Sequence, residues 1–413
     1  MGEGPRGAAG GAARVRLVHV TTVPESLGFL SGQPGYLAAR GYEVHAVSSP
    51  GERLGAFGAA EGVPCHAVPM ARAISPGRDL VALARLWRAL RRLRPDVVDA
   101  HTPKAGLLAM LAARLAGTRV RVYHVHGLRY ATARGPARAL LVASERLAAA
   151  LATHVLCVSP SVAAMAVADR VVPAGKVKVL LGGSINGVDA ARRFRPPDGE
   201  AGRCAARVSV GIDPAARVLG FVGRLVREKG VLELLAAWRA LREELPDLRL
   251  VLVGPREAHD PLPREALATL EDDPRITCAG LDWDTPRWFA AMDVVALPSW
   301  REGFPVVPLE AAAMALPVVA TSVPGCVDAV VDGRTGTLVP PRDPPALAAA
   351  LRTYLLDPAL RARHGAAARA RVLAEFEREA LWAALHAEYE RALAGAGTPA
   401  GAPAEAQAGL RAG

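Results

Sequence analysis

The chain has 413 residues, of which 51% are hydrophobic, and its formal net charge is +10. This length and apolar content support two globular domains of ordinary size. No run approaches the roughly 18 to 20 apolar residues that span a bilayer, and the N-terminus lacks a signal peptide's apolar core, so we expect a soluble or peripheral protein. The five cysteines show no CxxC spacing, which indicates reduced thiols and supports neither a disulfide framework nor a zinc site.

The first half alternates strands and helices, a pattern typical of a parallel, doubly wound α/β domain. We expect this domain over residues 14–192, after a disordered segment of Gly, Ala and Pro at residues 1–13. Its strands are predicted at residues 15–20, 43–48, 97–100, 121–125, 154–159 and 177–182.

Positive charge gathers in this half of the chain. Residues 1–190 contain 23 Lys plus Arg against 11 Asp plus Glu, a balance of +12, whereas the remaining 223 residues carry −2. Segment 78–95 predicts an amphipathic helix with Arg85, Arg88 and Arg92 lying away from its leucine stripe. An ordinary helix that covers a sheet has the same pattern, and weak electrostatic contact with an anionic membrane is compatible with both interpretations.

Two histidines directly follow predicted strands of this domain. His101 comes after VVDA and His126 after VYHV. Ligands of open α/β sheets bind beyond the carboxyl ends of the strands, so both side chains could face a cleft. His124 lies within its strand and is expected to be a packed or hydrogen-bonded core residue.

The alternation is interrupted at residues 193–216, which begin with a stretch rich in Pro, Gly and charge and are predicted to be a linker. A second doubly wound domain is expected over residues 217–374. Its strands are predicted at residues 218–222, 249–253, 275–278, 293–297 and 317–321. A last helix is predicted at residues 375–393, followed by a disordered tail at residues 394–413.

The second domain opens with FVGRLVREKG (221–230), which reads as a buried strand, a glycine turn and a helix start. Arg224 and Lys229 are placed to reach an anion at the carboxyl end of that strand. The chain has only four lysines, so Lys229 is less readily explained as routine surface filling than an arginine would be.

Two glutamates, Glu302 and Glu310, flank a second helix start. Pro308 is predicted to be the first helical residue, with Val307 as the N-cap and Glu310 at the third position. Valine offers no capping oxygen, so the N–H groups of the first turn and the positive helix end suit a nucleotide diphosphate. An acidic residue that only complements the helix dipole explains Glu310 equally well.

In this order, the segments resemble the retaining nucleotide-sugar glycosyltransferases of the large bacterial family 4, which have the two-domain GT-B fold. The resemblance covers roughly residues 14–390 and includes HTPKAGLLAMLAARLAG (101–117), NGVD (186–189), GRLVREKG (223–230) and SWREGFPVVPLEAAAMALPVVAT (299–321). The N-terminal segments are most similar to enzymes that build capsular, exopolysaccharide or lipid-linked oligosaccharide chains. The glycines before NGVD depart from the family pattern, which often has an asparagine there.

The resemblance implies an acceptor-binding first domain, a donor-binding second domain and a last helix that crosses back to the first. It implies that the donor diphosphate is bound by Arg224, Lys229, Gly303, Phe304, Val306 and Val307. The transferred sugar would contact His126 and Glu302, the ribose would contact Glu310, and His101 would be a further cleft residue. Gly28, Gly32 and Gln33 would form an acceptor or phosphate loop, although a flexible connection has the same glycine-rich composition.

The implied activity is retaining transfer of a hexosyl or N-acetylhexosaminyl group, with a UDP-sugar as the first expectation for the donor. The acceptor would be lipid-linked or a saccharide of bacterial surface polysaccharides, handled at the cytoplasmic membrane face. No cofactor, metal or nucleic acid is expected. Arg224 and Lys229 can neutralise a diphosphate, and Asp282-Trp283-Asp284 is interpreted as an accidental DxD spacing.

Three alternatives remain open from the sequence. A natural-product glycosyltransferase would use a small-molecule acceptor, and a nucleotide-sugar 2-epimerase would use the same fold without any acceptor. A non-catalytic basic protein would bind membrane or nucleic acid with a steep dependence on salt.

Overall fold

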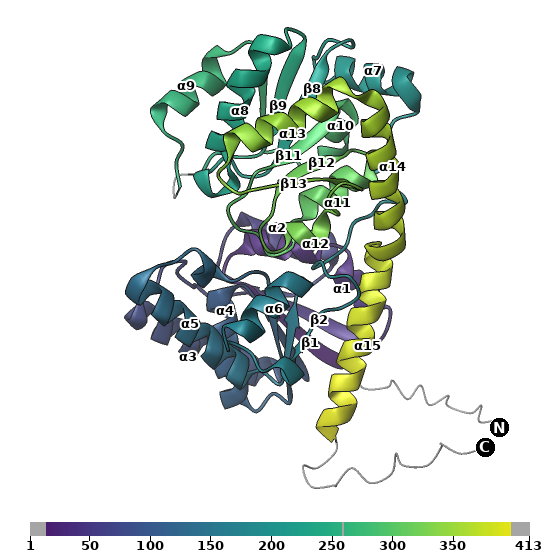
Figure 1. The fold of residues 1–413 in the computed structure, drawn as a ribbon. Helices are drawn as coiled ribbons and strands as arrows, with labels where there is room; N and C mark the ends of the chain where they lie inside the picture. The colour runs from purple at the N-terminus through teal and green to yellow at the C-terminus, as the bar shows by residue number, and fades with distance from the viewer. Residues whose placement is uncertain (1–13, 258–259, 398–413) are drawn as a thin grey trace, which may run out of the picture.

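The computed structural model describes residues 14–257 and 260–397, which form two parallel sheets covered by helices on both faces (Figure 1). This arrangement confirms the prediction of two doubly wound α/β domains. The predictions of disorder for residues 1–13 and 398–413 lie outside the described residues.

The N-terminal sheet has seven parallel strands in the order β3-β2-β1-β4-β5-β6-β7. Their bounds are β1 Val15–Val20, β2 Tyr42–Ser48, β3 Cys65–Ala67, β4 Val97–His101, β5 Val120–Val125, β6 His154–Cys157 and β7 Val177–Lys178. The predicted strand at 177–182 is shorter in the structure, where β7 ends at Lys178. Positive φ angles at Leu181 and Gly183 take the later part of the segment out of the extended region. Strand β3 was not predicted.

Helices bury both faces of this sheet, as parallel sheets require. One face carries α3 Pro76–Leu93, α4 Pro103–Ala116, α5 Gly135–Leu151 and α6 Pro160–Ala168, and the other carries η1 Pro24–Leu30, α1 Gln33–Ala38 and α2 Glu52–Glu61. Short 3-10 turns lie at η2 Arg129–Ala131 and η3 Ala174–Lys176. In α3 the buried side chains are Ala82, Leu86 and Leu90, and the predicted arginine face is exposed.

The C-terminal sheet has six parallel strands in the order β10-β9-β8-β11-β12-β13. Their bounds are β8 Arg217–Val222, β9 Leu248–Val253, β10 Ile276–Gly280, β11 Val294–Leu297, β12 Val318–Thr321 and β13 Gly336–Val339. The helices are η4 Arg227–Lys229, α8 Val231–Glu244, α9 Arg264–Asp272, α10 Thr285–Ala291, α11 Val306–Ala313, α12 Cys326–Ala329, α13 Pro344–Leu356 and α14 Pro358–Glu375. Because the strands are parallel, their carboxyl ends share one edge with the starts of η4 and α11.

The segment predicted as a linker, residues 193–216, contains a helix. α7 Gly199–Ser209 packs against α10, and its Arg207 forms a buried ion pair with Asp293 at 2.7 Å. The Pro, Gly and charge content that suggested a linker belongs to the turn before α7 and to the exposed face of this amphipathic helix. The segment is therefore attached to the second domain.

The last helix, α15 Arg378–Gly397, lies against the N-terminal domain (Figure 1). Tyr389 donates a 2.6 Å hydrogen bond to Asp99 of β4, and Glu390 accepts one of 2.7 Å from Tyr42 of β2. The helix extends to residue 397, so the predicted start of a disordered tail at residue 394 is wrong.

Candidate functional site

The two domains touch at a glycine. A Cβ atom added to Gly303 would lie 1.8 Å from the carbonyl oxygen of His126, so any side chain there would collide with the backbone of the other domain. The Ser159 hydroxyl donates a 2.8 Å hydrogen bond to the carbonyl of Gly303. The two predicted site segments, one on each domain, therefore pack directly against each other.

Next to this contact, Lys229 and Glu302 form an ion pair. The ammonium of Lys229, at the end of η4, lies 2.5 Å from Oε1 of Glu302. The lysine side chain is 19% exposed and the glutamate side chain 9%, so water screens the pair only partly. Lys229, which was expected to bind the diphosphate, thus contacts Glu302, which was expected to bind the sugar.

Arg224 is also held by carboxylates. Its guanidinium lies 2.8 Å from Glu228 and 3.1 Å from Glu257, and Glu228 also pairs with Arg301 at 3.1 Å. Burial acts to lower the pKa of Arg224, but Glu257 and Glu228 outweigh it and raise the pKa. A bound diphosphate would have to compete with these acidic partners for the cation.

Helix α11 begins earlier than predicted. Val307 is not the N-cap: Pro305 is the N-cap, and Val306 is the first helical residue. Pro308 fits the third position because residues of the first turn need no amide hydrogen for the helix. No side chain caps this helix, so the N–H groups of Val306 and Val307 point out of its positive end.

Glu310 is consequently the fifth residue of α11 rather than the third. It is partly buried, and this burial raises its pKa to about 7, against the opposing influence of Arg193 and Arg378. Phe304, just before the helix, is buried and packs against Phe376 with a ring-centroid distance of 5.4 Å.

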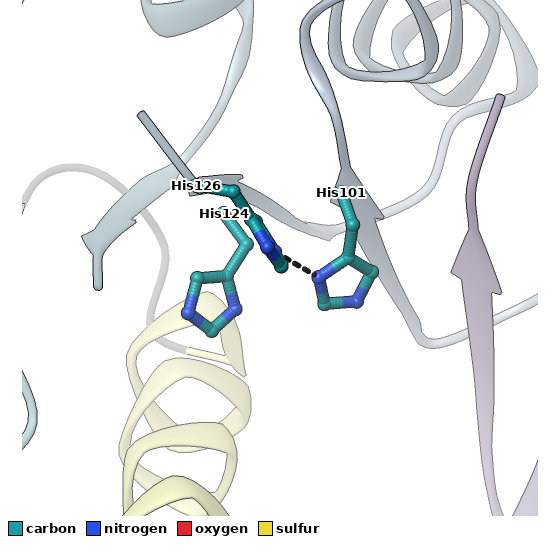
Figure 2. Close-up of side chains that lie close together, drawn as sticks. All are labelled: His101, His124 and His126. Carbon is teal, nitrogen blue, oxygen red and sulfur yellow. Dashed lines mark hydrogen bonds between the residues drawn. The ribbon is translucent and has the colours of Figure 1, made fainter. Parts of the chain in front are cut away.

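Across the contact, the N-terminal domain presents a histidine cluster (Figure 2). Nδ1 of His101 lies 2.9 Å from Nε2 of His126, and Nε2 of His101 lies 3.1 Å from Nδ1 of His19. Burial lowers the pKa of His126 to about 3 and that of His19 to about 4, and it also lowers the pKa of His101. These imidazoles are therefore neutral at pH 7.

Sequence reasoning missed His19 and Asp99 and treated His124 only as a core residue. Strand register brings them together: His19 lies opposite Asp99 in the β1–β4 pair, and His101 lies opposite His124 in the β4–β5 pair. The period-two spacing in DAH and in HVH places these polar side chains on common faces of their strands. The sequence shows this spacing, but it does not show the register in which the strands pair.

The predicted glycine loop lies near this cluster, since the ring centroid of Phe29 is 6.3 Å from that of His126. Gly28 belongs to η1, and Gly32 precedes α1 with a φ of +83°. The N–H of Gly32 donates to both carboxylate oxygens of Glu61, at 3.0 and 2.9 Å, so a protein carboxylate holds the amide that was expected at a phosphate. Gln33 is buried.

The first aspartate of the DxD sequence, Asp282, has a structural role. Asp282 accepts hydrogen bonds from the indole of Trp288 at 2.8 Å and the backbone N–H of Asp284 at 2.9 Å, and it also pairs with Arg287. The hydrogen bonds from Trp288 and Asp284, with the contribution of Arg287, lower its pKa to about 2. Asp282 therefore already serves the turn before α10.

Comparisons with known proteins divide the chain in the same way as the fold. Residues 216–357 match the family of glycosyl transferases group 1, and residues 35–183 match the glycosyl transferase 4-like domain.

Similar proteins include the capsular polysaccharide biosynthesis glycosyltransferase CapM of Staphylococcus aureus, 29% identical over 91% of this chain and 96% of CapM. The UDP-Gal:alpha-D-GlcNAc-diphosphoundecaprenol alpha-1,3-galactosyltransferase of Escherichia coli is 29% identical over 62% of this chain and 65% of its own. Among solved structures, HepE of Anabaena in complex with UDP and glucose has a TM-score of 0.74 at 20% identity and covers 91% of this chain and 100% of its own. This likeness shows the same fold.

Proposed function

This chain belongs to the glycosyl transferases group 1, with a glycosyl transferase 4-like N-terminal domain, and we propose that it transfers a sugar from UDP to a bacterial surface glycan with retention of configuration. The observation that carries the proposal is the meeting of Lys229 and Glu302 beside the interdomain contact. The acceptor is lipid-linked or a saccharide, since CapM and the Escherichia coli enzyme are named for such products.

The leaving diphosphate develops negative charge as the anomeric C–O bond breaks. Arg224 and Lys229 supply fixed positive charge for it, and the N–H groups of Val306 and Val307 add the positive end of α11. Gly303 and Phe304 bring the backbone close to the phosphates. Charge stabilisation by these groups requires no divalent metal at the diphosphate.

The sugar side develops oxocarbenium character. Glu302, released from Lys229 by the diphosphate, positions a sugar hydroxyl and stabilises the positive charge, while His126 contacts the sugar from the other domain. Glu310 accepts hydrogen bonds from the ribose diol. Glu302 acts by positioning and electrostatics rather than as a covalent nucleophile, and a trapped glycosyl-enzyme would contradict that role.

The acceptor side is basic and faces an open cavity. A cavity of 660 Å³ is lined in part by Met70 and, in α3, by Arg78, Val81 and Arg85.

Within the described residues, no helix has the length and apolarity needed to cross a bilayer. Val81 is 50% exposed and the neighbouring Leu80 is 68% exposed, so arginines and apolar side chains share one surface. This surface contacts an anionic leaflet at the cytoplasmic face and receives a lipid-linked acceptor there.

A thermal-shift screen with UDP-, GDP- and dTDP-sugars tests the donor assignment, because a ligand that binds the folded state raises its stability. We expect a UDP-sugar to raise the melting temperature equally with EDTA or with Mn²⁺. Loss of the shift in EDTA and its return with Mn²⁺ would contradict a metal-independent donor site. Conversion of the sugar without an acceptor and without release of UDP would identify an epimerase instead.

A further inference from the structure

The cluster around Asp99 is more elaborate than a sugar contact requires. The rings of His101, His124 and His126 lie in a triangle, with centroids 5.1 to 5.3 Å apart (Figure 2). One nitrogen from each ring can be chosen so that all three lie within 4.8 Å of one another. The three side chains come from the carboxyl ends of two adjacent strands, β4 and β5, which fix their backbones.

Beneath this triangle lies a carboxylate with unusual surroundings. Asp99 is 0% exposed, and its recorded ion pairs within the described part of the chain are with His101 at 3.7 Å and His124 at 3.6 Å. Among those residues, its carboxylate accepts one hydrogen bond, from the hydroxyl of Tyr389. Buried charges in proteins are normally paired or coordinate metals. Neither imidazole lies within hydrogen-bond distance of this carboxylate.

Several polar atoms of the cluster also lack hydrogen-bond partners among the described residues. These atoms are Nε2 of His19, Nδ1 of His124 and Oδ1 of Asp99, and all three residues are at most 4% exposed. An unpartnered buried polar atom destabilises the folded state, and here three occur within one cluster. The cluster therefore has the composition of a binding site whose ligand supplies positive charge.

We propose that His101, His124 and His126 bind a divalent transition metal ion, with Zn²⁺ as the first candidate. Neutral imidazole is the form that binds such ions, and borderline-soft metals such as zinc select it over carboxylate-only sites. Two nitrogens at about 2.0 to 2.1 Å from a tetrahedral metal are about 3.3 Å apart. The His101 to His126 distance of 2.9 Å would need to open by only a few tenths of an ångström.

Asp99 fits the role of the outer partner in such a site. A metal-bound histidine usually donates its other N–H to a carboxylate, which fixes the ring and increases its basicity. Asp99 lies between His101 and His124, and Tyr389 on α15 holds it in place. A second possible group, His19 with Asp99 and His101, is wholly buried, whereas His126 is only partly buried and gives the first group access to solvent.

This proposal departs from the expectation of a metal-free chain, and it replaces the direct contact of His126 with the sugar by a metal ion held there. It leaves the diphosphate contacts unchanged. The diphosphate still relies on Arg224, Lys229 and α11, and the ion would be held by nitrogen ligands that disfavour Mg²⁺ and Mn²⁺. Metal binding can be measured without any knowledge of the sugar or the acceptor. Its failure is thus separable from failure of the proposed activity.

The experiment uses the full chain without a polyhistidine tag, stripped with a chelator, reloaded with Zn²⁺ and passed over a desalting column. We expect about one equivalent of zinc by elemental analysis, and a visible d–d spectrum of tetrahedral type after loading with Co²⁺. His124→Gln should lose the bound zinc, whereas His154→Gln, which changes a histidine outside the cluster, should keep it. Asp99→Asn should weaken zinc binding by about 10- to 100-fold.

Circular dichroism of each variant shows whether it folds, and the result for the parent chain does not depend on any variant. Absence of bound zinc and cobalt in the folded parent would overturn the proposal and indicate that the cluster neutralises Asp99 with a shared proton. Equal zinc content in the parent and in His124→Gln would also overturn it, because the ion would then lie elsewhere.

Discussion

Lys229 and Glu302 form an ion pair, with Nζ and Oε1 2.5 Å apart. The two residues come from different elements, η4 and the loop before α11, so their pairing fixes the positions of both. In the proposed function, a diphosphate that binds the lysine would free the carboxylate for the sugar. Donor binding would thus make the carboxylate of Glu302 available to the sugar.

Lys229→Ala should weaken donor binding by about 1.5 to 3 kcal/mol, or roughly 10- to 150-fold in Kd, since it removes a charge-assisted contact. Isothermal titration with the UDP-sugar measures this change. The control is Lys104→Ala, which breaks a comparably shielded pair with Asp79 at 2.7 Å in the other domain. Equal affinities for the parent and Lys229→Ala would show that this lysine does not bind the diphosphate.

Glu310 should make donor affinity depend on pH. Its pKa of about 7 lies above the ordinary value of 4.5, so it becomes neutral as the pH falls below 7, and a neutral carboxyl accepts hydrogen bonds from the ribose less strongly. The UDP-sugar Kd should then rise by up to about tenfold per unit between pH 7 and pH 5. The Glu310→Gln variant should bind the UDP-sugar weakly, and its Kd should depend little on pH. If the Kd of this variant changed with pH as it does in the parent, another group would be responsible for the titration.

The raised pKa also has a consequence for stability. A folded state in which Glu310 holds its proton more tightly than the unfolded chain gains stability at low pH and loses it as the pH rises through about 7. Glu310→Gln should remove this loss, so the melting temperature of the variant should improve relative to the parent between pH 5 and pH 8.

The arginine face of α3 should mediate membrane contact. Replacing Arg85, Arg88 and Arg92 with glutamine should reduce sedimentation with anionic liposomes, since each basic residue near the surface contributes about 1 kcal/mol. Donor binding should not change. A matched triple replacement of exposed arginines in the second domain, Arg256, Arg287 and Arg334, controls for net charge, and an equal loss in both variants would mean that α3 has no special role.

The helix α7 should be essential to the second domain. Arg207 and Asp293 form a pair at 2.7 Å with only 5% and 7% of their side chains exposed. Arg207→Ala would leave the buried carboxylate with only a longer pair to Arg361 at 3.8 Å and the N–H of Val218. We expect a loss of about 3 to 5 kcal/mol in the free energy of unfolding, measured with denaturant. The exposed pair of Arg217 and Asp247 is the control, and Arg217→Ala should cost less than about 1 kcal/mol.

Much of the fold follows from local pattern, and the errors occur where long-range contacts decide. Alternating apolar runs predicted both sheets, but the same reading of Pro and Gly before α7 missed the helix that Arg207 anchors on Asp293. Val307 was predicted as a cap because Pro308 suits the first helical position, yet Pro305 and Val306 begin the helix. Both assignments obey local rules, and only packing selects between them.

The site shows the same division. Arg224, Lys229, Glu302 and Glu310 were proposed as site residues from motif order and remain a prediction. The acidic partners Glu228 and Glu257 of Arg224 were not predicted. The histidine cluster depends on the register of three strands. Two of its members, His19 and His101, are 82 residues apart in the sequence. No local pattern encodes that register.

The most direct test measures acceptor-dependent transfer. The purified chain is incubated with a UDP-sugar that stabilises it and with lipid-linked oligosaccharide acceptors, and UDP release and the glycosylated product are quantified together. We expect equal amounts of UDP and of product with an α-anomeric bond when the donor sugar is α-linked, and a strong decrease of both in Lys229→Ala. Sugar conversion without UDP release, or an inverted linkage in the product, would contradict it.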